Sequence, residues 1–216
     1  MVKKKEPKQE SSWIVVCFFT KNTPYEDVAN KYLIKSLEKL GIFHVVYEVL
    51  NNGDWLENIA YKPEIILKAM NKFPDKDIVY LDADSIVCKY PDLFDKISPE
   101  IDIAYHLLDW DTWYCNNTGH KEVFNSTIFL RNNEQTKEFV GKWMAETIDS
   151  PKTGEHLVFD ELIKQDMKNH KTLNHYNLPL TYAYINSMPN GTKPNTYIKN
   201  PVITCYQKSR ELRYKL

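Results

Sequence analysis

Two carboxylates follow a strongly apolar stretch of the chain. Residues 77–85 read DIVYLDADS, an expected strand that ends at Asp82 and Asp84. Successive side chains of a strand point to opposite faces, so Asp82 and Asp84 should project the same way while Ala83 turns away. Such a pair can hold a hard divalent cation, Mg²⁺ or Mn²⁺, that keeps positions open for water and phosphate oxygens. The first hypothesis is therefore a nucleotide-diphosphate–metal site.

Other sites also use two aspartates at this spacing. The calcium loop of an EF-hand needs Gly at its sixth and Glu at its twelfth position, where Val87 and Leu93 stand if the count starts at Asp82. A phosphatase with Asp82 as nucleophile would favour Thr or Val at the fifth position, which is Ile86, and would carry the motif after the first strand. The phosphatase stays open as an alternative, as does a pair of solvated carboxylates at an ordinary turn.

The strands and helices expected before residue 77 predict where Asp82 and Asp84 lie in the fold. Residues 13–20 form a continuous apolar run, typical of a strand buried on both faces. A helix over 25–40 that ends at Gly41, a strand over 42–49 and a helix over 62–73 lead to the strand that starts at Asp77. This order predicts a parallel sheet with right-handed connections. Ligands of such sheets bind beyond the carboxyl ends of the strands, where Asp82 and Asp84 fall.

The second half of the chain is less regular. Strands are expected over 101–108, 125–131, 172–175, 180–184 and 202–204, helices over 134–148 and 156–167, and an ordered loop over 181–199. The segment 109–114 combines two aspartates with three aromatic rings, which suits the apolar C–H faces and the hydroxyls of a saccharide. We expect a disordered tail over 1–12 and a single domain over 13–216.

Composition narrows the classes of protein. The chain has 216 residues and a formal net charge of -1, so no global basic field favours nucleic acid. The cysteines Cys17, Cys88, Cys115 and Cys205 form no CxxC pair, which argues against a disulfide framework or a zinc site. No signal peptide and no transmembrane segment is expected. We expect a cytoplasmic protein, with peripheral attachment to a membrane compatible with the sequence.

Several segments, taken in order, resemble glycosyltransferases of the GT-A fold. The resemblance covers residues 13 to about 213 and implies an α/β fold, the Rossmann-like nucleotide-diphospho-sugar transferase fold, with a mostly parallel central sheet and helices on both faces. The segments that carry it are Phe19-Thr20-Lys21, Tyr61 to Ile66, Val79 to Asp84, Tyr90 to Phe94, Phe124 to Asn132, Trp143 with Asp160-Glu161, and Pro201 to Arg210.

The resemblance also implies a function and a set of site residues. It implies a metal-dependent transferase, with Mn²⁺ or Mg²⁺, that moves a hexose from a UDP- or GDP-sugar to an acceptor hydroxyl, such as that of a saccharide. Asp82 and Asp84 would bind the metal, and Asp160, Asp109 or Asp111 would deprotonate the acceptor if the reaction inverts the anomeric centre. The expected nucleotide and donor contacts are Thr20, Lys21, Tyr25, Lys62, Asp82, Ala83, Asp84, Asn125, Ser126, Thr127, Glu161, Gln207, Lys208 and Arg210.

Two positions depart from the family pattern. Thr127 stands where a glycine is usual, and Cys205 stands where a histidine often supplies a third metal ligand. A thiolate is a poor ligand for Mg²⁺ and only tolerable for Mn²⁺. These departures keep a second alternative open, a protein of this fold that binds nucleotide sugars without turnover.

Overall fold

The computed structural model describes residues 11–114, 119–170, 172–186 and 198–212. Cys115, most of the expected tail 1–12 and most of the expected loop 181–199 lie outside these ranges. The strands are β1 Trp13–Thr20, β2 His44–Val49, β3 Asp77–Leu81, β4 Ser85–Val87, β5 Ile103–Asp109, β6 Lys121–Leu130, β7 His175–Asn177, β8 Tyr184–Ile185 and β9 Ile203–Cys205. The helices are α1 Pro24–Ala29, α2 Lys35–Leu40, α3 Trp55–Ile59, α4 Tyr61–Lys72, α5 Trp110–Tyr114, α6 Glu134–Asp149, α7 Glu155–Gln165 and α8 Ser209–Leu212.

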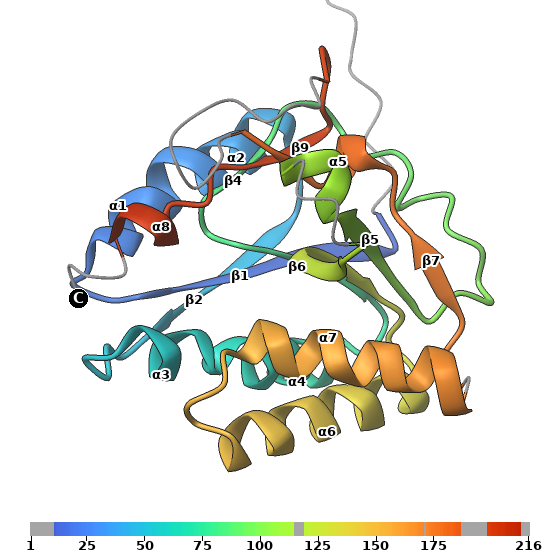
Figure 1. Ribbon diagram of the computed structural model, residues 1–216. Helices are drawn as coiled ribbons and strands as arrows, with labels where there is room; N and C mark the ends of the chain where they lie inside the picture. Colours follow the sequence, from blue (N-terminus) through green and yellow to red (C-terminus); the bar gives the residue numbers. More distant parts are fainter. Residues whose placement is uncertain (1–10, 115–118, 171, 187–197, 213–216) are drawn as a thin grey trace, which may run out of the picture.

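A six-stranded sheet in the order β2-β1-β3-β6-β5-β7 runs through the centre of the molecule (Figure 1). β1 pairs in parallel with β2 and β3, and β5 pairs in parallel with β7. β6 is antiparallel to both of its neighbours, β3 and β5. The predicted α/β architecture with a mostly parallel sheet is confirmed.

The burial of β1 follows from its sequence. Its side chains alternate between two apolar clusters, with Ile14 and Val16 on one face of the sheet and Trp13, Val15 and Cys17 on the other. A strand covered on both faces needs apolar residues at every position, which is why the run 13–20 lacks the polar alternation of a surface strand. β1 is therefore the central scaffold of the site at its carboxyl end.

Helices cover both faces of the sheet, as predicted (Figure 1). α4, α6 and α7 bury Ile66, Val140 and Phe159 in the cluster on one face. On the opposite face, the segment from α1 to α2 buries Leu33 and Leu37. This segment contains a π-helical turn, Asn30–Ile34, inside the helix expected over 25–40, and it ends at Gly41, whose φ of 64° is the left-handed conformation that favours glycine.

Some elements differ from the expectation. Asp54 caps α3, an unexpected helix, by accepting hydrogen bonds from the backbone N–H groups of Leu56 and Glu57. Residues 109–114, expected as a loop, contain α5, and 180–184 contain a 3₁₀ turn before β8 instead of one strand.

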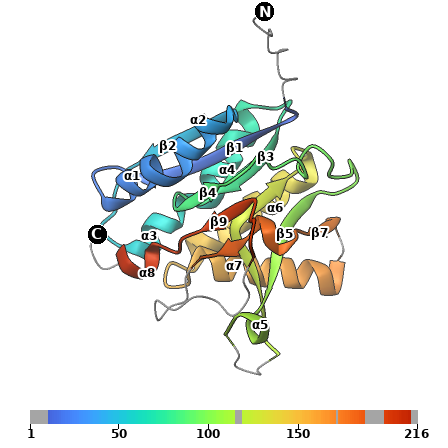
Figure 2. The ribbon, with the colours of Figure 1, turned by 90° about the horizontal axis from the view of Figure 1, so that it is seen from above.

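β4 was not expected, and it pairs antiparallel with β9 in a second sheet of order β4-β9-β8. Figure 2 shows β4 and β9 side by side. This pairing brings the last described segment of the chain against the segment that carries Asp82 and Asp84. In the described part of the chain, no helix is long and apolar enough to cross a membrane.

Candidate functional site

A pocket of about 250 Å³ lies at the carboxyl ends of β1 and β3. It brings together side chains from the first strand–helix turn, the start of α4, the end of β3, the middle of β6 and the turn after β9. Of the residues predicted from the sequence, those that line the pocket are Thr20, Tyr25, Lys62, Asp82, Ala83, Asp84, Asn125, Ser126 and Gln207. The edge of the sheet expected to bind the ligand is thus the edge that contains the cavity.

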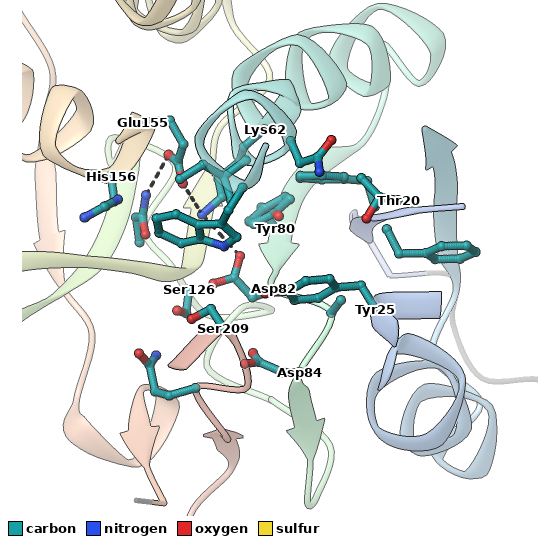
Figure 3. A pocket seen from close by; sticks show the side chains of 18 of the residues that line it. Thr20, Tyr25, Lys62, Tyr80, Asp82, Asp84, Ser126, Glu155, His156 and Ser209 are labelled. Carbon is teal, nitrogen blue, oxygen red and sulfur yellow. Dashed lines mark hydrogen bonds and ion pairs between the residues drawn. The ribbon is translucent and has the colours of Figure 1, made fainter. Parts of the chain in front are cut away.

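A buried cation lies on one wall of the pocket (Figure 3). Lys62 is 4% exposed, and its Nζ lies 3.2 Å from Oδ1 of Asp82 and 2.8 Å from Oε1 of Glu155. Burial lowers the pKa of Lys62, but Asp82 and Glu155 outweigh burial and raise it overall. Asn125 donates a hydrogen bond of 2.9 Å to the other oxygen of Glu155. Lys62 is therefore a fixed positive charge shared by two carboxylates.

Asp84 lies deeper than Asp82 and is contacted by the segment after β9. The thiol of Cys205 donates to Oδ1 of Asp84 at 3.3 Å, and the backbone N–H of Lys208 donates to Oδ2 at 2.5 Å. Burial, followed by the charge of Asp82, raises the pKa of Asp84 to about 6. Burial and the neighbouring Asp84 and Asp82 also raise the pKa of Cys205 well above its usual value, so this side chain is a neutral thiol.

The turn that carries the Lys208 N–H contains an unusual backbone conformation. Gln207 has a φ of 52°, in the left-handed region that residues other than glycine adopt at a cost of order 1–3 kcal/mol. The Gln207 side chain lines the pocket and its Nε2 lies 3.1 Å from Sγ of Cys205. The backbone is thus strained at the turn that contacts Asp84. Strained backbone conformations of this kind cluster at functional sites.

The donor atoms fit a hard divalent cation only in part. Asp82 and Asp84 supply carboxylate oxygens on one pocket, and each oxygen of Asp84 has a second lone pair beside its hydrogen bond. Within the described ranges, no group of three or more His, Cys, Asp or Glu side chains could hold a metal ion. Remaining ligands would therefore have to be water or phosphate oxygens, the usual partners of Mg²⁺.

The other predicted donor contacts do not line the pocket in the part of the chain that the structure describes. Lys21 pairs with Glu48 on the surface, and Glu161 accepts a hydrogen bond from Gln165. Thr127 is fully buried and its Oγ1 has no hydrogen-bond partner. The side chain of Lys208 pairs with Glu211, although its backbone N–H reaches Asp84, and Arg210 lies in α8.

The three predicted bases are engaged elsewhere. Oδ1 of Asp109 accepts the N–H of Asp111 at the start of α5, and Oδ2 of Asp111 accepts the N–H of Gly119. Asp160 accepts the N–H of Val123 at 2.8 Å and pairs with Lys164. Among the described residues, none of the three lines the pocket.

Sequence reasoning missed several side chains that line the pocket. The titratable ones are Tyr80, Glu122, Glu155 and His156, and Trp55 adds an aromatic face. One signal in the sequence could have identified Glu155 and His156. Gly154 is the N-cap residue of α7, so the helix starts at Glu155, one residue before the expected start at 156. The helix start, rather than Asp160-Glu161 one turn later, faces the cavity.

No protein-family model and no curated protein matches the chain. Solved structures do resemble it. A glycosyltransferase involved in the glycosylation of the major capsid of PBCV-1 is 16% identical, with a TM-score of 0.60 over 94% of this chain and 98% of that one. The glycosyltransferase GlyE of Streptococcus pneumoniae TIGR4 is 14% identical, with a TM-score of 0.60 over 95% of this chain and 60% of that one. The bifunctional glycosyltransferase WbbM is 14% identical, with a TM-score of 0.55 over 94% of this chain and 47% of that one.

The chain therefore spans less than two thirds of the GlyE and WbbM chains. At this level of identity the likeness concerns the fold, and the protein has a GT-A-like glycosyltransferase fold.

Proposed function

We propose that this protein is a glycosyltransferase that moves a hexose from a nucleoside diphosphate sugar to the hydroxyl of an acceptor such as a saccharide. One observation carries the proposal. In a fold shared with glycosyltransferases, Asp82 and Asp84 line the cavity at the carboxyl ends of β1 and β3, together with side chains from distant segments of the chain. The paired carboxylates and the cavity are what a metal-bound diphosphate requires.

We propose that Asp82 and Asp84 hold Mn²⁺ or Mg²⁺. Both lie on the pocket, and their mutual repulsion contributes to the raised pKa of Asp84, which a bound cation relieves. When bound, the metal neutralises charge on the departing nucleoside diphosphate. Cys205 keeps its proton and acts as a hydrogen-bond donor to Asp84, so in this proposal it orients a ligand instead of binding the metal.

The chain's own side chains would bind the donor along the pocket. Thr20 and Tyr25 lie at the β1–α1 turn, where the nucleotide would bind, and Asn125 and Ser126 of β6 present polar groups for sugar hydroxyls. Lys62 keeps Asp82 and Glu155 in place without adding a free charge to the cavity. Aromatic and polar groups converging on one cavity are typical of small-ligand sites.

Calorimetric titration of UDP and GDP, with and without Mn²⁺, tests the proposal on the wild type and on Asp84→Ala. We expect metal-dependent binding of one nucleotide to the wild type and its loss in Asp84→Ala. Glu146→Ala, a surface change on α6 that removes a carboxylate paired with Lys142, is the matched control and should bind like the wild type. If neither nucleotide binds with metal present, the donor site is wrong, and release of phosphate from small phosphomonoesters becomes the next assay.

A further inference from the structure

His156 differs from the other titratable side chains of the pocket. It lies in the first turn of α7 and lines the cavity, with its ring centroid 6.3 Å from that of Trp55 on α3. Within the described part of the chain, His156 has no side-chain hydrogen bond and no ion pair, unlike Lys62, Asp84, Glu122 and Tyr80. Those four are held by protein groups: Lys62 with Asp82 and Glu155, Asp84 with Cys205 and Lys208, Glu122 with Trp110, and Tyr80 with Asp82.

Gly154 makes room for the imidazole of His156. A Cβ atom at Gly154 would lie 2.4 Å from Cε1 and 2.7 Å from Nδ1 of the His156 ring. The backbone of Gly154, with φ of -60° and ψ of 139°, is one that any residue adopts. The glycine is therefore required by the position of the ring and not by the backbone, and the sequence Gly154-Glu155-His156 sets the imidazole against the start of α7.

The surroundings keep this imidazole neutral. Burial, followed by the charge of Lys62 on α4, lowers the pKa of His156, while Asp82 after β3 and Asp160 on α7 oppose the shift. Glu122 of β6 and Glu155 of α7 also line the cavity. A neutral imidazole without a hydrogen-bond partner among the described residues has a nitrogen lone pair available to accept a proton at neutral pH.

We propose that His156 is the base that removes the proton from the acceptor hydroxyl, and that the acceptor binds in the pocket against the edges that Trp55 and His156 present to it. The inference rests on the proposed function and gives His156 the role for which Asp109, Asp111 and Asp160 were expected. The acceptor class is a sugar hydroxyl, because an indole ring suits the C–H face of a saccharide while the imidazole accepts its O–H proton.

The proposed step balances as an inverting displacement. The acceptor oxygen forms a bond to the anomeric carbon while its proton passes to the His156 nitrogen. The bond from the anomeric carbon to the diphosphate oxygen breaks, and its electron pair leaves with the nucleoside diphosphate. The imidazolium then returns its proton to solvent, and the negative charges of Asp82 and Asp160 favour its brief existence.

The test compares His156→Ala with the wild type in the presence of Mn²⁺. UDP-glucose, UDP-galactose and GDP-mannose serve as donors, methyl glycosides and water serve as acceptors, and release of UDP or GDP is measured. We expect turnover to fall by about 10²–10⁴-fold, the usual contribution of a general base, while nucleotide affinity is unchanged. Azide needs no deprotonation, so it should restore donor cleavage in His156→Ala and give the glycosyl azide.

Two further readouts separate a base from a structural residue. Wild-type turnover should fall as the pH drops through the lowered pKa of His156. His156→Gln should remove this contribution and leave only the acid limb of Asp84 and Glu155, whose pKa values are raised to about 6 and about 7. Proton NMR of the wild-type product should show an inverted anomeric centre. His44→Ala, at a half-buried histidine on β2 outside the pocket, should behave as the wild type.

Gly154→Ala tests the geometry without changing any titratable group. The added Cβ should turn the imidazole away and reduce turnover while nucleotide binding persists. Gly141→Ala on α6, where a Cβ would meet no atom within 4 Å, is the matched control. Normal turnover in His156→Ala, an acid limb that His156→Gln leaves unchanged, or a retained anomeric centre each overturns the role of His156 alone. A wild type that neither binds UDP or GDP nor cleaves these donors overturns the proposed function as well.

Discussion

Replacement of Asp84 by asparagine should stabilise the protein in the absence of metal and nucleotide, and more so at higher pH. Asp84 is 7% exposed, and burial and Asp82 raise its pKa from 3.8 to about 6. A group whose pKa is higher in the folded state contributes stability that is fully present below pH 3.8 and is lost as the pH rises through about 6. Asparagine keeps an acceptor oxygen for the Lys208 N–H without carrying the charge.

The pKa shift sets the size of the effect. Each pKa unit corresponds to about 1.4 kcal/mol, so full ionisation of Asp84 costs the folded state about 3 kcal/mol. Because the group titrates across this interval, about half of that cost, roughly 1–2 kcal/mol, develops between about pH 5 and pH 8.

Urea unfolding followed by circular dichroism measures the effect. The difference in unfolding free energy between Asp84→Asn and the wild type should shift by roughly 1–2 kcal/mol in favour of the variant from about pH 5 to pH 8. Titration of Glu155 and His156 is common to both proteins and largely cancels in the difference. Asp92→Asn is the control. Lys96 lowers the pKa of exposed Asp92, which is therefore ionised throughout pH 5 to 8, so the difference between this variant and the wild type should not change over this interval. A difference between Asp84→Asn and the wild type that does not change with pH would refute the reasoning.

Three other changes test separate features. Lys62→Met leaves the carboxylates of Asp82 and Glu155 without their buried cation and should destabilise the protein by about 3–5 kcal/mol at pH 8. The loss should be smaller at pH 5, because burial raises the pKa of Glu155 to about 7 and this carboxyl is then protonated. Urea unfolding at both pH values measures it, and an equal loss at both would contradict the assignment. Gly41→Ala places a Cβ at a φ of 64° and should lower the unfolding free energy by about 1 kcal/mol, read from the urea midpoint. Cys205→Ser keeps a hydrogen-bond donor to Asp84, so Mn²⁺-dependent nucleotide affinity should be preserved in calorimetry, and its loss would identify the thiol as a metal ligand.

The sequence predicted the elements whose hydrophobic pattern is long and periodic. β1 was predicted with its observed bounds, because eight consecutive residues are suited to a strand buried on both faces. α6 was predicted to within one residue of its end. Short elements depend on tertiary contacts instead. β4 has only three residues and forms because β9 pairs with it, so no local pattern indicates it.

The residues of the candidate site also differ in how far the sequence could predict them. Asp82 and Asp84 were predicted from the end of an apolar strand, whereas Lys62 was predicted only from the resemblance to glycosyltransferases. The cavity includes all three. Glu155 lies one residue before the expected helix, and His156, the first residue of that helix, belongs to no recognised motif. Asp160-Glu161, by contrast, matches the family pattern. Asp160 instead supports β6 through the N–H of Val123, a contact that no spacing in the sequence reveals.

The pairing of β4 with β9 has a consequence for how the protein is made. Asp84 and its partners Cys205 and Lys208 are separated by 121 and 124 positions along the chain. Closing so long a loop costs entropy that local contacts cannot offset, so this contact should form late in folding. A chain still on the ribosome that has emerged only as far as β8 carries both carboxylates but lacks the groups that hold Asp84. Such a chain should fold its central sheet first and acquire the complete pocket only when β9 and the following turn are released.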